Sequence, residues 1–159
     1  EYSSKLNEMI IQTQSDVKSG NPVTDIVIGE YKDKCIKTGI DFTYDFHYPE
    51  KGVVDAFDMS IVLFNALQNA CEAAQKTPHG YVSLKAFRKK NAYIIEITNS
   101  CAGRITVEPG KLPATDKDNA QAHGYGLKNI KRIAEKYYGG INIEPADDTF
   151  KLNIMMMLE

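Results

Sequence analysis

Two stretches of the chain repeat apolar residues at the spacing of an α-helix. The first, residues 57–74, contains mostly good helix formers and predicts a mostly buried helix with apolar surface from Ile61, Leu63, Phe64 and Leu67. The second follows residue 123 and repeats the pattern at Leu127, Ile130, Ile133, Ala134 and Tyr137. We expect this second helix to begin near Gly124 or Gly126, and Gly139 is well placed to cap its end.

The amino-terminal part of the chain predicts two further helices. Residues 1–19 carry a narrow apolar stripe at Leu6, Met9, Ile10, Thr13 and Val17, and the sequence Gly20-Asn21-Pro22 ends it. Residues 24–38 are apolar at Ile26, Val27, Tyr31, Cys35 and Ile36, and Gly39 closes that helix. The first stripe is too narrow for a core helix, so it fits either a surface helix or a helix packed against a partner helix.

Alternating apolar and polar residues predict five strands. Residues 40–46 form one strand, residues 81–87 and 92–98 form a hairpin around 89–91, and residues 141–144 and 150–157 form a hairpin around 146–148. Five strands with helices gathered on one face predict an α+β fold, a two-layer α/β sandwich with a mixed five-stranded sheet preceded by an amino-terminal helix.

Composition indicates a single globular domain. The chain has 159 residues, of which 43% are hydrophobic and 25% charged, and its formal net charge of −2 argues against a broad basic surface for nucleic acid. No apolar run approaches the roughly 20 residues of a membrane span. The three cysteines lack metal or redox spacing and fit small core residues in a reducing compartment. Because the chain starts within an expected helix, we expect a longer protein whose preceding part holds membrane helices.

Asn65 and Asn69 are four residues apart on the helix at 57–74, so both side chains point the same way, and Glu72 follows on that stripe. A buried carboxamide without hydrogen-bond partners costs about 1–3 kcal/mol. The two asparagines therefore need either neighbouring backbone groups or a bound ligand. Both explanations stay open on this evidence alone.

Gly124 and Gly126 stand at the expected start of the last helix. Glycines there let the backbone approach a ligand, and the free amides with the positive end of the helix dipole favour phosphate oxygens. Lys128 adds positive charge nearby. A tight turn without a ligand is the alternative explanation for these glycines.

Taken together, these motifs resemble the GHKL, or Bergerat, ATP-binding fold of histidine kinases, gyrase-type topoisomerases, ninety-kilodalton heat-shock chaperones and mismatch-repair ATPases. Residues 65–73 resemble the N box and residues 123–130 the G2 box, most closely those of peptide-sensing quorum kinases of Gram-positive bacteria. The resemblance implies the end of a dimerisation helix and linker at 1–20 and an ATP-binding catalytic domain at 21–159.

The resemblance also implies the residues of the site. ATP would contact Asn65, Asn69, Asn99, Gly103, His123, Gly124, Tyr125, Gly126, Leu127 and Lys128, and Asn69 would also bind Mg²⁺. The G1 box departs from the usual Asp-x-Gly-x-Gly, since residues 99–103 read Asn-Ser-Cys-Ala-Gly. The Asn99 carbonyl can still accept a hydrogen bond from the adenine amino group, without the charge-assisted strength of an aspartate.

The identity of residue 65 distinguishes branches of this family. Hydrolysing members resemble one another in carrying a glutamate there that activates water, whereas Asn65 has no useful basicity. Bound triphosphate should then persist until another acceptor reaches it. Asn65 and Asn69 are accordingly the catalytic candidates. Glu72 is a displaced base or a surface residue, and phosphate charge would be compensated by Lys76, Lys128 or Arg132.

Residues 100–122 lack periodicity and resemble the ATP lid, hinged at Gly103 and the Gly124 turn. Its cations Arg104, Lys111 and Lys117 are candidates for phosphate contacts or solvated loop charges, and His123 stands at its end.

None of the three histidines, His47, His79 and His123, has the helical context of a phosphoacceptor. The resemblance thus implies a cytoplasmic domain of a membrane-anchored sensor kinase. Its partners would be a phosphoacceptor helix elsewhere in the same protein, a response regulator and a second copy in a homodimer. The alternatives are a GHKL ATPase or anti-sigma-type serine kinase, and a degenerate, non-catalytic binding module.

Overall fold

The computed structural model describes residues 3–5, 17–50, 53–103 and 120–158, without the side chains of 120–125. Helices and strands follow one another in this part of the chain in the order α2 (Pro22–Lys37), β1 (Asp41–Phe46), α3 (Ala56–Gln75), β2 (Tyr81–Lys89), β3 (Ala92–Ser100), α4 (Ala120–Lys136), β4 (Gly140–Pro145) and β5 (Thr149–Met157). All five predicted strands are present, with small differences at their ends.

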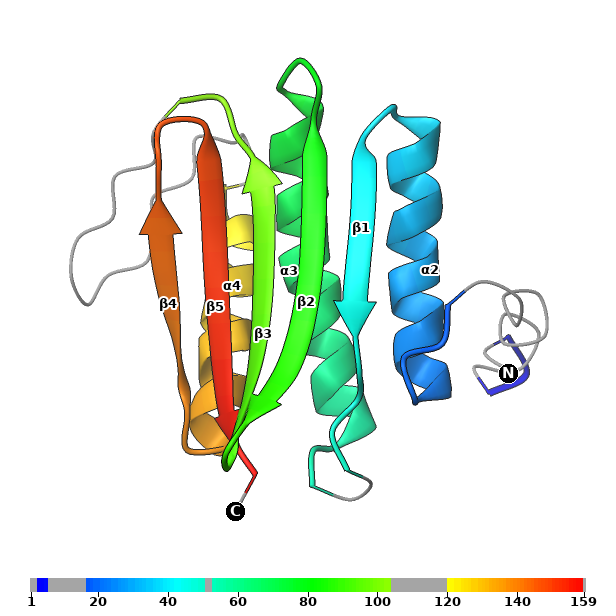
Figure 1. Cartoon of the computed structure of the whole chain (residues 1–159), viewed down its shortest axis with the longest axis vertical. Helices are drawn as coiled ribbons and strands as arrows, with labels where there is room; N and C mark the ends of the chain where they lie inside the picture. Colours follow the sequence, from blue (N-terminus) through cyan, green and yellow to red (C-terminus); the bar gives the residue numbers. More distant parts are fainter. Residues whose placement is uncertain (1–2, 6–16, 51–52, 104–119, 159) are drawn as a thin grey trace.

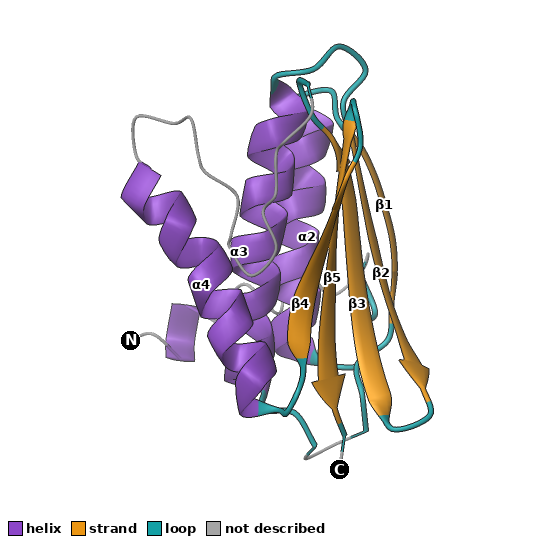
Figure 2. Cartoon of the chain, turned by 90° about the vertical axis from the view of Figure 1, so that its left-hand side faces the viewer, coloured by secondary structure: helices purple, strands orange, loops and turns teal. Residues whose placement is uncertain are grey.

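The strands form one mixed sheet in the order β1-β2-β3-β5-β4 (Figure 1). β1 and β2 are parallel, and every other neighbouring pair is antiparallel. Helices α2, α3 and α4 lie on one face of this sheet (Figure 2). The predicted two-layer α+β sandwich is therefore confirmed. Among the described residues, no helix combines the length and apolarity needed to span a bilayer.

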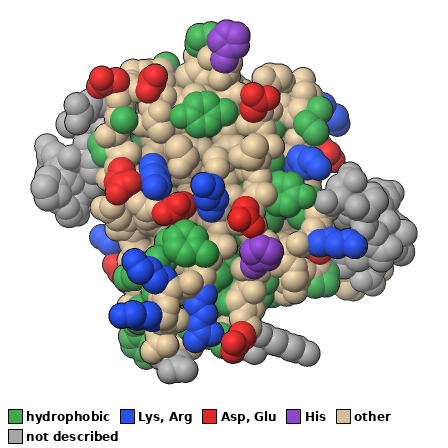
Figure 3. Space-filling view, viewed as in Figure 1, with side chains coloured by type: hydrophobic (Ala, Val, Ile, Leu, Met, Phe, Trp, Pro, Cys, Tyr) green, Lys and Arg blue, Asp and Glu red, His purple; other side chains and the backbone are tan. Residues whose placement is uncertain are grey.

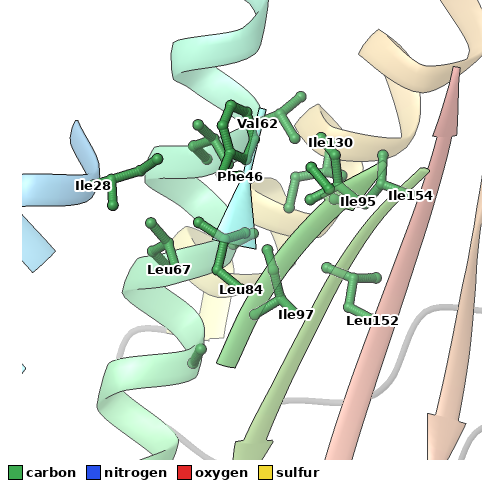
Figure 4. Close-up of a cluster of buried hydrophobic side chains, with 14 of the residues drawn as sticks. Ile28, Phe46, Val62, Leu67, Leu84, Ile95, Ile97, Ile130, Leu152 and Ile154 are labelled. Carbon is green, nitrogen blue, oxygen red and sulfur yellow. The ribbon is translucent and has the colours of Figure 1, made fainter. Parts of the chain in front are cut away.

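The core lies between the sheet and the three helices. On β3, for example, Ile95 and Ile97 are buried while their neighbours Ile94 and Glu96 are half-buried on the other face. Figure 4 shows side chains from helices and strands meeting in this layer, among them Ile28, Val62, Leu67, Leu84, Ile130 and Ile154. Burial of this apolar surface, at about 25 cal/mol per Å², is what holds the helices on the sheet.

The opposite face of the sheet carries charged, polar and apolar side chains side by side (Figure 3). Lys151 on β5 lies between carboxylates of the two neighbouring strands, with its Nζ 3.7 Å from Glu96 and 3.9 Å from Glu144. These partly exposed pairs contribute little stability each. The hydrophobic core therefore lies on the helix-covered side of the sheet.

Two apolar residues of the predicted helices lie at the surface. Phe64 is 44% exposed, so its placement on a mostly buried helix surface is wrong, and Ile36 of α2 is 64% exposed. On α2 the buried face passes through Ile28 and Cys35, and Ile36 lies about 100° away from Cys35 around the helix. Phe64 packs edge-on against the ring of Tyr31 with centroids 5.9 Å apart.

The helix predicted at 1–19 falls mostly outside the described residues. Residues 3–5 are helical, whereas residues 17–21 are not, so the prediction that the helix reaches Ser19 is wrong. The Ser19 amide and hydroxyl both donate to Asp25 Oδ1 at 2.6 Å, and Asn21 Oδ1 caps α2 by accepting from the Val23 amide at 2.9 Å. These bonds turn the chain into α2 before the first helix could continue.

The two predicted glycine caps have different outcomes. Gly39 ends α2 in the left-handed region with φ +73°, which confirms that prediction. At the end of α4, Tyr138 takes this conformation with φ +59°. Hydrogen bonds from the Tyr138 amide to Glu135 O (3.0 Å) and from the Gly139 amide to Ala134 O (2.8 Å) form a Schellman motif around it. The left-handed position of this motif, where glycine is usual, is therefore occupied by Tyr138, so the prediction that Gly139 caps the helix is wrong by one residue.

Tyr138→Gly should raise the free energy of unfolding by about 1 kcal/mol, because it removes the left-handed strain of a residue with a β-carbon. The Tyr138 side chain is 83% exposed and has little packing to lose. Urea unfolding measures the change. Tyr138→Ala, which keeps the β-carbon, is the control and should not raise the free energy of unfolding. Equal stability of the glycine and alanine variants would show that residue 138 is not strained.

Candidate functional site

Helix α3 holds Asn65 and Asn69 at the border of its buried face. Asp55 caps the helix by accepting from the Phe57 and Asp58 amides at 2.8 and 3.1 Å. Burial of the core-facing side of the helix fixes its rotation against the sheet, through Met59, Val62, Leu63, Ala66, Leu67, Ala70, Cys71 and Ala74. Both carboxamides are half-buried, one turn apart, and face α4.

Gly126 of α4 lies directly against these carboxamides. A β-carbon at residue 126 would stand 3.4 Å from Asn65 Oδ1 and 3.5 Å from Asn69 Nδ2. The two predicted motifs, which are far apart in the sequence, therefore meet in space. The groups that line this approach are polar carboxamides and bare backbone, which suit a polar ligand.

The carboxamide of Asn65 is oriented by its own helix. Its Nδ2 donates to the Ile61 carbonyl at 2.8 Å, which turns Oδ1 toward Gly126. For this nitrogen the partner is therefore a neighbouring backbone group, one of the two explanations left open by the sequence, and a bond from an asparagine to the carbonyl four residues earlier is a known pattern. Ile61 thus positions one of the two candidate catalytic side chains.

Asp58 connects the start of α3 to the end of α4 through two hydrogen bonds. Lys136 Nζ and the Tyr137 hydroxyl donate to Asp58 Oδ2 at 2.8 and 2.7 Å. Burial alone would raise the pKa of Asp58, but these hydrogen bonds outweigh it and hold this pKa below its ordinary value. The contact therefore stabilises the fold at neutral pH and is lost as the pH falls through the lowered pKa.

Helix α4 begins at Ala120, so the prediction of a start near Gly124 or Gly126 is wrong. Residues 120–122, Ala-Gln-Ala, are good helix formers and extend the helix by more than a turn. Both glycines then lie inside the helix, where their amides are not the free amides of its first turn, and Gly126 brings the α4 backbone close to Asn65 and Asn69. The free amides of the first turn belong to residues nearer Ala120.

The other predicted residues of the G2 box differ in position. The side chains of His123 and Tyr125 lie outside the described residues, so their roles stay predictions. Leu127 is 9% exposed and packs in the core, which leaves its backbone for any ligand contact. Lys128 is exposed on the surface of α4.

Asn99 lies at the end of β3, on the face toward the helices. It is 3% exposed, and its Nδ2 donates to the Ser100 carbonyl at 2.9 Å. This bond uses one of the two amide hydrogens, so Oδ1 and the second amide hydrogen are the groups that a purine would meet. Ser100 Oγ lies 2.9 Å from Thr77 Oγ1 just beyond α3, which ties this end of β3 to the end of that helix.

The end of β3, the carboxyl-terminal half of α3 and the start of α4 lie at the same end of the domain (Figure 1). Gly103 follows β3 with φ +82° and open space around its α-carbon, which suits the expected hinge. Both ends of the expected lid at 100–122 belong to regular elements, since Ser100 is the last residue of β3 and residues 120–122 form the start of α4. Residues 104–119, with Arg104, Lys111 and Lys117, lie outside the described residues.

The residues predicted to compensate the charge of the phosphates lie at different places on the helices. Arg132 adds an electrostatic contribution to the lowered pKa of Asp58, and its contact with phosphate stays a prediction. Lys76 caps the end of α3, and the next residue, Thr77, contacts Ser100 at the end of β3. Glu72 Oε1 accepts from Gln68 Nε2 at 3.5 Å on the helix surface.

Comparison with known proteins agrees with this geometry. A family model described as GHKL domain matches residues 54–157. No curated protein sequence matches the chain.

Solved histidine kinase structures share the fold. The catalytic domain of histidine kinase ThkA is 22% identical with a TM-score of 0.62, over 89% of this chain and 95% of that one. The Acinetobacter baumannii histidine kinase AdeS is 15% identical with a TM-score of 0.63, over 99% of this chain and 76% of that one. A histidine kinase from Burkholderia phymatum is 17% identical with a TM-score of 0.63, over 99% and 77%. At these identities the likeness establishes the fold.

Proposed function

The chain belongs to the GHKL family, and from that premise we propose that it is the ATP-binding catalytic domain of a sensor histidine kinase, transferring the γ-phosphate of ATP to a histidine outside this chain. The observation that carries the proposal is the position of Gly126 against Asn65 and Asn69, where a β-carbon at residue 126 would lie 3.4 and 3.5 Å from their carboxamide atoms. A triphosphate at this junction would meet two carboxamides and a close helix backbone.

The residue at position 65 favours a kinase over a hydrolase. The Asn65 amide is held by the Ile61 carbonyl, and a carboxamide cannot take a proton from water. Glu72, the nearest carboxylate along the same stripe, accepts a hydrogen bond from Gln68. Bound ATP would therefore wait for an external acceptor, and phosphoryl transfer depends mainly on positioning and charge stabilisation.

The residues present fit a magnesium ion that accompanies the nucleotide. Mg²⁺ keeps several waters and uses few protein oxygens, and the Asn69 carboxamide, whose Nδ2 lies toward Gly126, would supply one through Oδ1. Magnesium would neutralise charge on the phosphate oxygens when bound. Asn69 would hold and orient it against the triphosphate.

The Asn99 carbonyl oxygen would accept from the adenine amino group at the other end of the site. The Asn99 side chain is neutral, so its bond to adenine lacks the charge-assisted strength of an aspartate, which predicts modest affinity. An acceptor oxygen at this position would favour adenine over guanine, while one amide hydrogen is held by the Ser100 carbonyl. Asparagine in place of aspartate here is the feature that favours the peptide-sensing quorum kinases as the nearest subfamily.

The remaining parts of the proposal concern the parent protein. Residues 1–20 would belong to the dimerisation helix and linker and residues 21–159 to the catalytic domain, although Val17 and Ser19 already pack against it, with 3% and 2% exposure. The phosphoacceptor helix, a response regulator and a second copy would be the partners of a membrane-anchored sensor whose catalytic domain faces the cytoplasm.

Radiolabelled ATP tests this function directly. The chain is incubated with γ-labelled ATP, Mg²⁺ and the histidine-bearing helical segment of its parent protein. We expect acid-labile, base-stable label on that segment, which is the signature of phosphohistidine. Phosphoserine on a partner would indicate an anti-sigma-type serine kinase, steady phosphate release without an acceptor would indicate an ATPase, and absence of nucleotide binding would indicate a non-catalytic module.

Gly126→Ala should separate stability from binding. Alanine inside a helix is favoured over glycine by up to about 1 kcal/mol, and its methyl fits at 3.4 Å from Asn65 Oδ1, so the free domain should become more stable. The same methyl fills the space where the backbone meets the ligand. We expect the affinity for ADP, measured by calorimetry, to fall on the order of tenfold, or about 1.4 kcal/mol.

Gly29→Ala is the matched control for this prediction. Gly29 is a buried helical glycine of α2, and a β-carbon there would meet Val17 Cγ2 at 3.8 Å. It should gain stability without changing ADP affinity. If Gly126→Ala binds ADP as tightly as Gly29→Ala does, the backbone at Gly126 is not part of the site.

A further inference from the structure

Cys35 and Cys71 form a pair that their sequence spacing conceals. Cys35 lies on α2 and Cys71 on α3, and their sulfur atoms are 3.1 Å apart across the interface of the two helices. Cys35 is 0% exposed and Cys71 is 7% exposed. The prediction that the cysteines are small core residues is confirmed, but two of them are also in direct contact.

The contact makes the two thiols chemically unequal. The hydrogen bond from Cys71 lowers the pKa of Cys35, against the opposing effect of burial. The same hydrogen bond and burial raise the pKa of Cys71. Cys35 is therefore the sulfur that reaches the thiolate form first, and the thiolate is the nucleophile in thiol oxidation.

We propose that Cys35 and Cys71 are an oxidation site, at which hydrogen peroxide converts the two thiols into an intramolecular disulfide joining α2 to α3. A disulfide has an S–S distance of about 2.05 Å, so the sulfur atoms need to approach by about 1 Å. A small neutral oxidant suits a pair with so little exposed surface. Nucleotide binding is not required for this reaction.

The reaction balances in two steps. The Cys35 thiolate attacks one peroxide oxygen, the O–O bond breaks, and hydroxide leaves and takes up the thiol proton as water, which gives a sulfenic acid on Cys35. The Cys71 sulfur then attacks the sulfenic sulfur, the S–S bond forms and the S–O bond breaks. The second hydroxide leaves as water with the Cys71 proton, so both sulfurs are oxidised and both peroxide oxygens are reduced.

The disulfide would lie close to the candidate nucleotide site. Cys71 follows Asn69 by two residues on α3. A bond from Cys71 to α2 would fix the helix that carries both carboxamides against its neighbour. The third cysteine offers an internal comparison, because Cys101 is equally buried at 6% exposure while its Sγ donates to the Gly103 carbonyl at 3.3 Å.

The test is peroxide treatment of the reduced, folded chain, followed by quenching, unfolding, alkylation and peptide mapping. We expect a Cys35–Cys71 disulfide within one chain and a single alkylated cysteine, Cys101. The bridge spans 36 residues, so it should raise the melting temperature on the order of 10 °C, reversibly with a thiol reductant.

Three variants complete the test. Cys35→Ala and Cys71→Ala should each abolish the disulfide and the thermal shift, whereas the matched Cys101→Ala should retain both. Since the mapping on the wild-type chain needs no variant, a misfolded variant does not affect the conclusion. Three alkylated cysteines after peroxide, sulfinic acids without a bridge, a bridge to Cys101 or a bridge between two chains would each overturn the proposal.

Discussion

Replacing Asn69 by alanine should remove the magnesium dependence of ATP-analogue binding and lower phosphoryl transfer on the order of 100-fold, as loss of one group that stabilises transition-state charge does elsewhere. Asn69 sits beside Gly126, with its Nδ2 3.5 Å from where a β-carbon would be. Removal of its oxygen leaves magnesium without its expected protein ligand. Binding titrations with and without Mg²⁺ measure the first effect, and transfer of label measures the second.

Gln68→Ala is the matched control for Asn69→Ala. Gln68 is the preceding residue of α3, is also half-buried, and donates to Glu72 on the same helix. It should bind the analogue with unchanged magnesium dependence. Asn69→Ala protein that still binds more tightly with Mg²⁺ would remove Asn69 from the metal site.

Gly139→Ala should lower the free energy of unfolding by about 3 kcal/mol or more, because overpacking against backbone cannot be relieved by a side-chain rotation. A β-carbon at residue 139 would lie 1.8 Å from the Met155 carbonyl oxygen and 2.5 Å from its carbon. Relief requires α4 or the β4–β5 pair to move. Urea unfolding followed by circular dichroism measures the loss.

The adjacent glycine provides the control for this effect. A β-carbon at Gly140 would have no atom within 4 Å, so Gly140→Ala should change stability little. Similar stabilities for the Gly139 and Gly140 variants would show that the close approach between α4 and β5 is not real.

The strands were predictable from sequence because each repeats apolar residues with a period of two and ends in turn residues. On β3, Tyr93, Ile95 and Ile97 alternate with more exposed positions, as the pattern requires. The apolar periodicity of a helix predicts less accurately which of its residues are buried against the sheet or a neighbouring helix. Phe64 and Ile36 have the residue types of a core, yet their neighbours Leu63 and Cys35 occupy the buried direction.

The site was predictable in part, for a related reason. The spacing of Asn65 and Asn69 places them on one face, and glycines near the start of α4 mark a close approach of the backbone. The approach occurs inside α4, because the helix-forming residues from Ala120 extend the helix beyond the glycine motif.

Contacts between distant segments could not be derived from local pattern. Tyr138 has the left-handed backbone conformation, whereas Gly139 lies where a β-carbon would clash with the Met155 carbonyl of β5. The Cys35–Cys71 contact depends on how α2 and α3 pack, and its sequence spacing matches no known motif.

The most direct measurement of the central claim is a titration of the isotopically labelled chain with a non-hydrolysable ATP analogue and Mg²⁺, followed by nuclear magnetic resonance. One site between α3 and α4 predicts that the side-chain amides of Asn65, Asn69 and Asn99 and the backbone amide of Gly126 shift together with one dissociation constant. Shifts confined to the α2–β1 edge, with Asn69 and Gly126 unmoved at saturation, would contradict the claim that these segments form the nucleotide site.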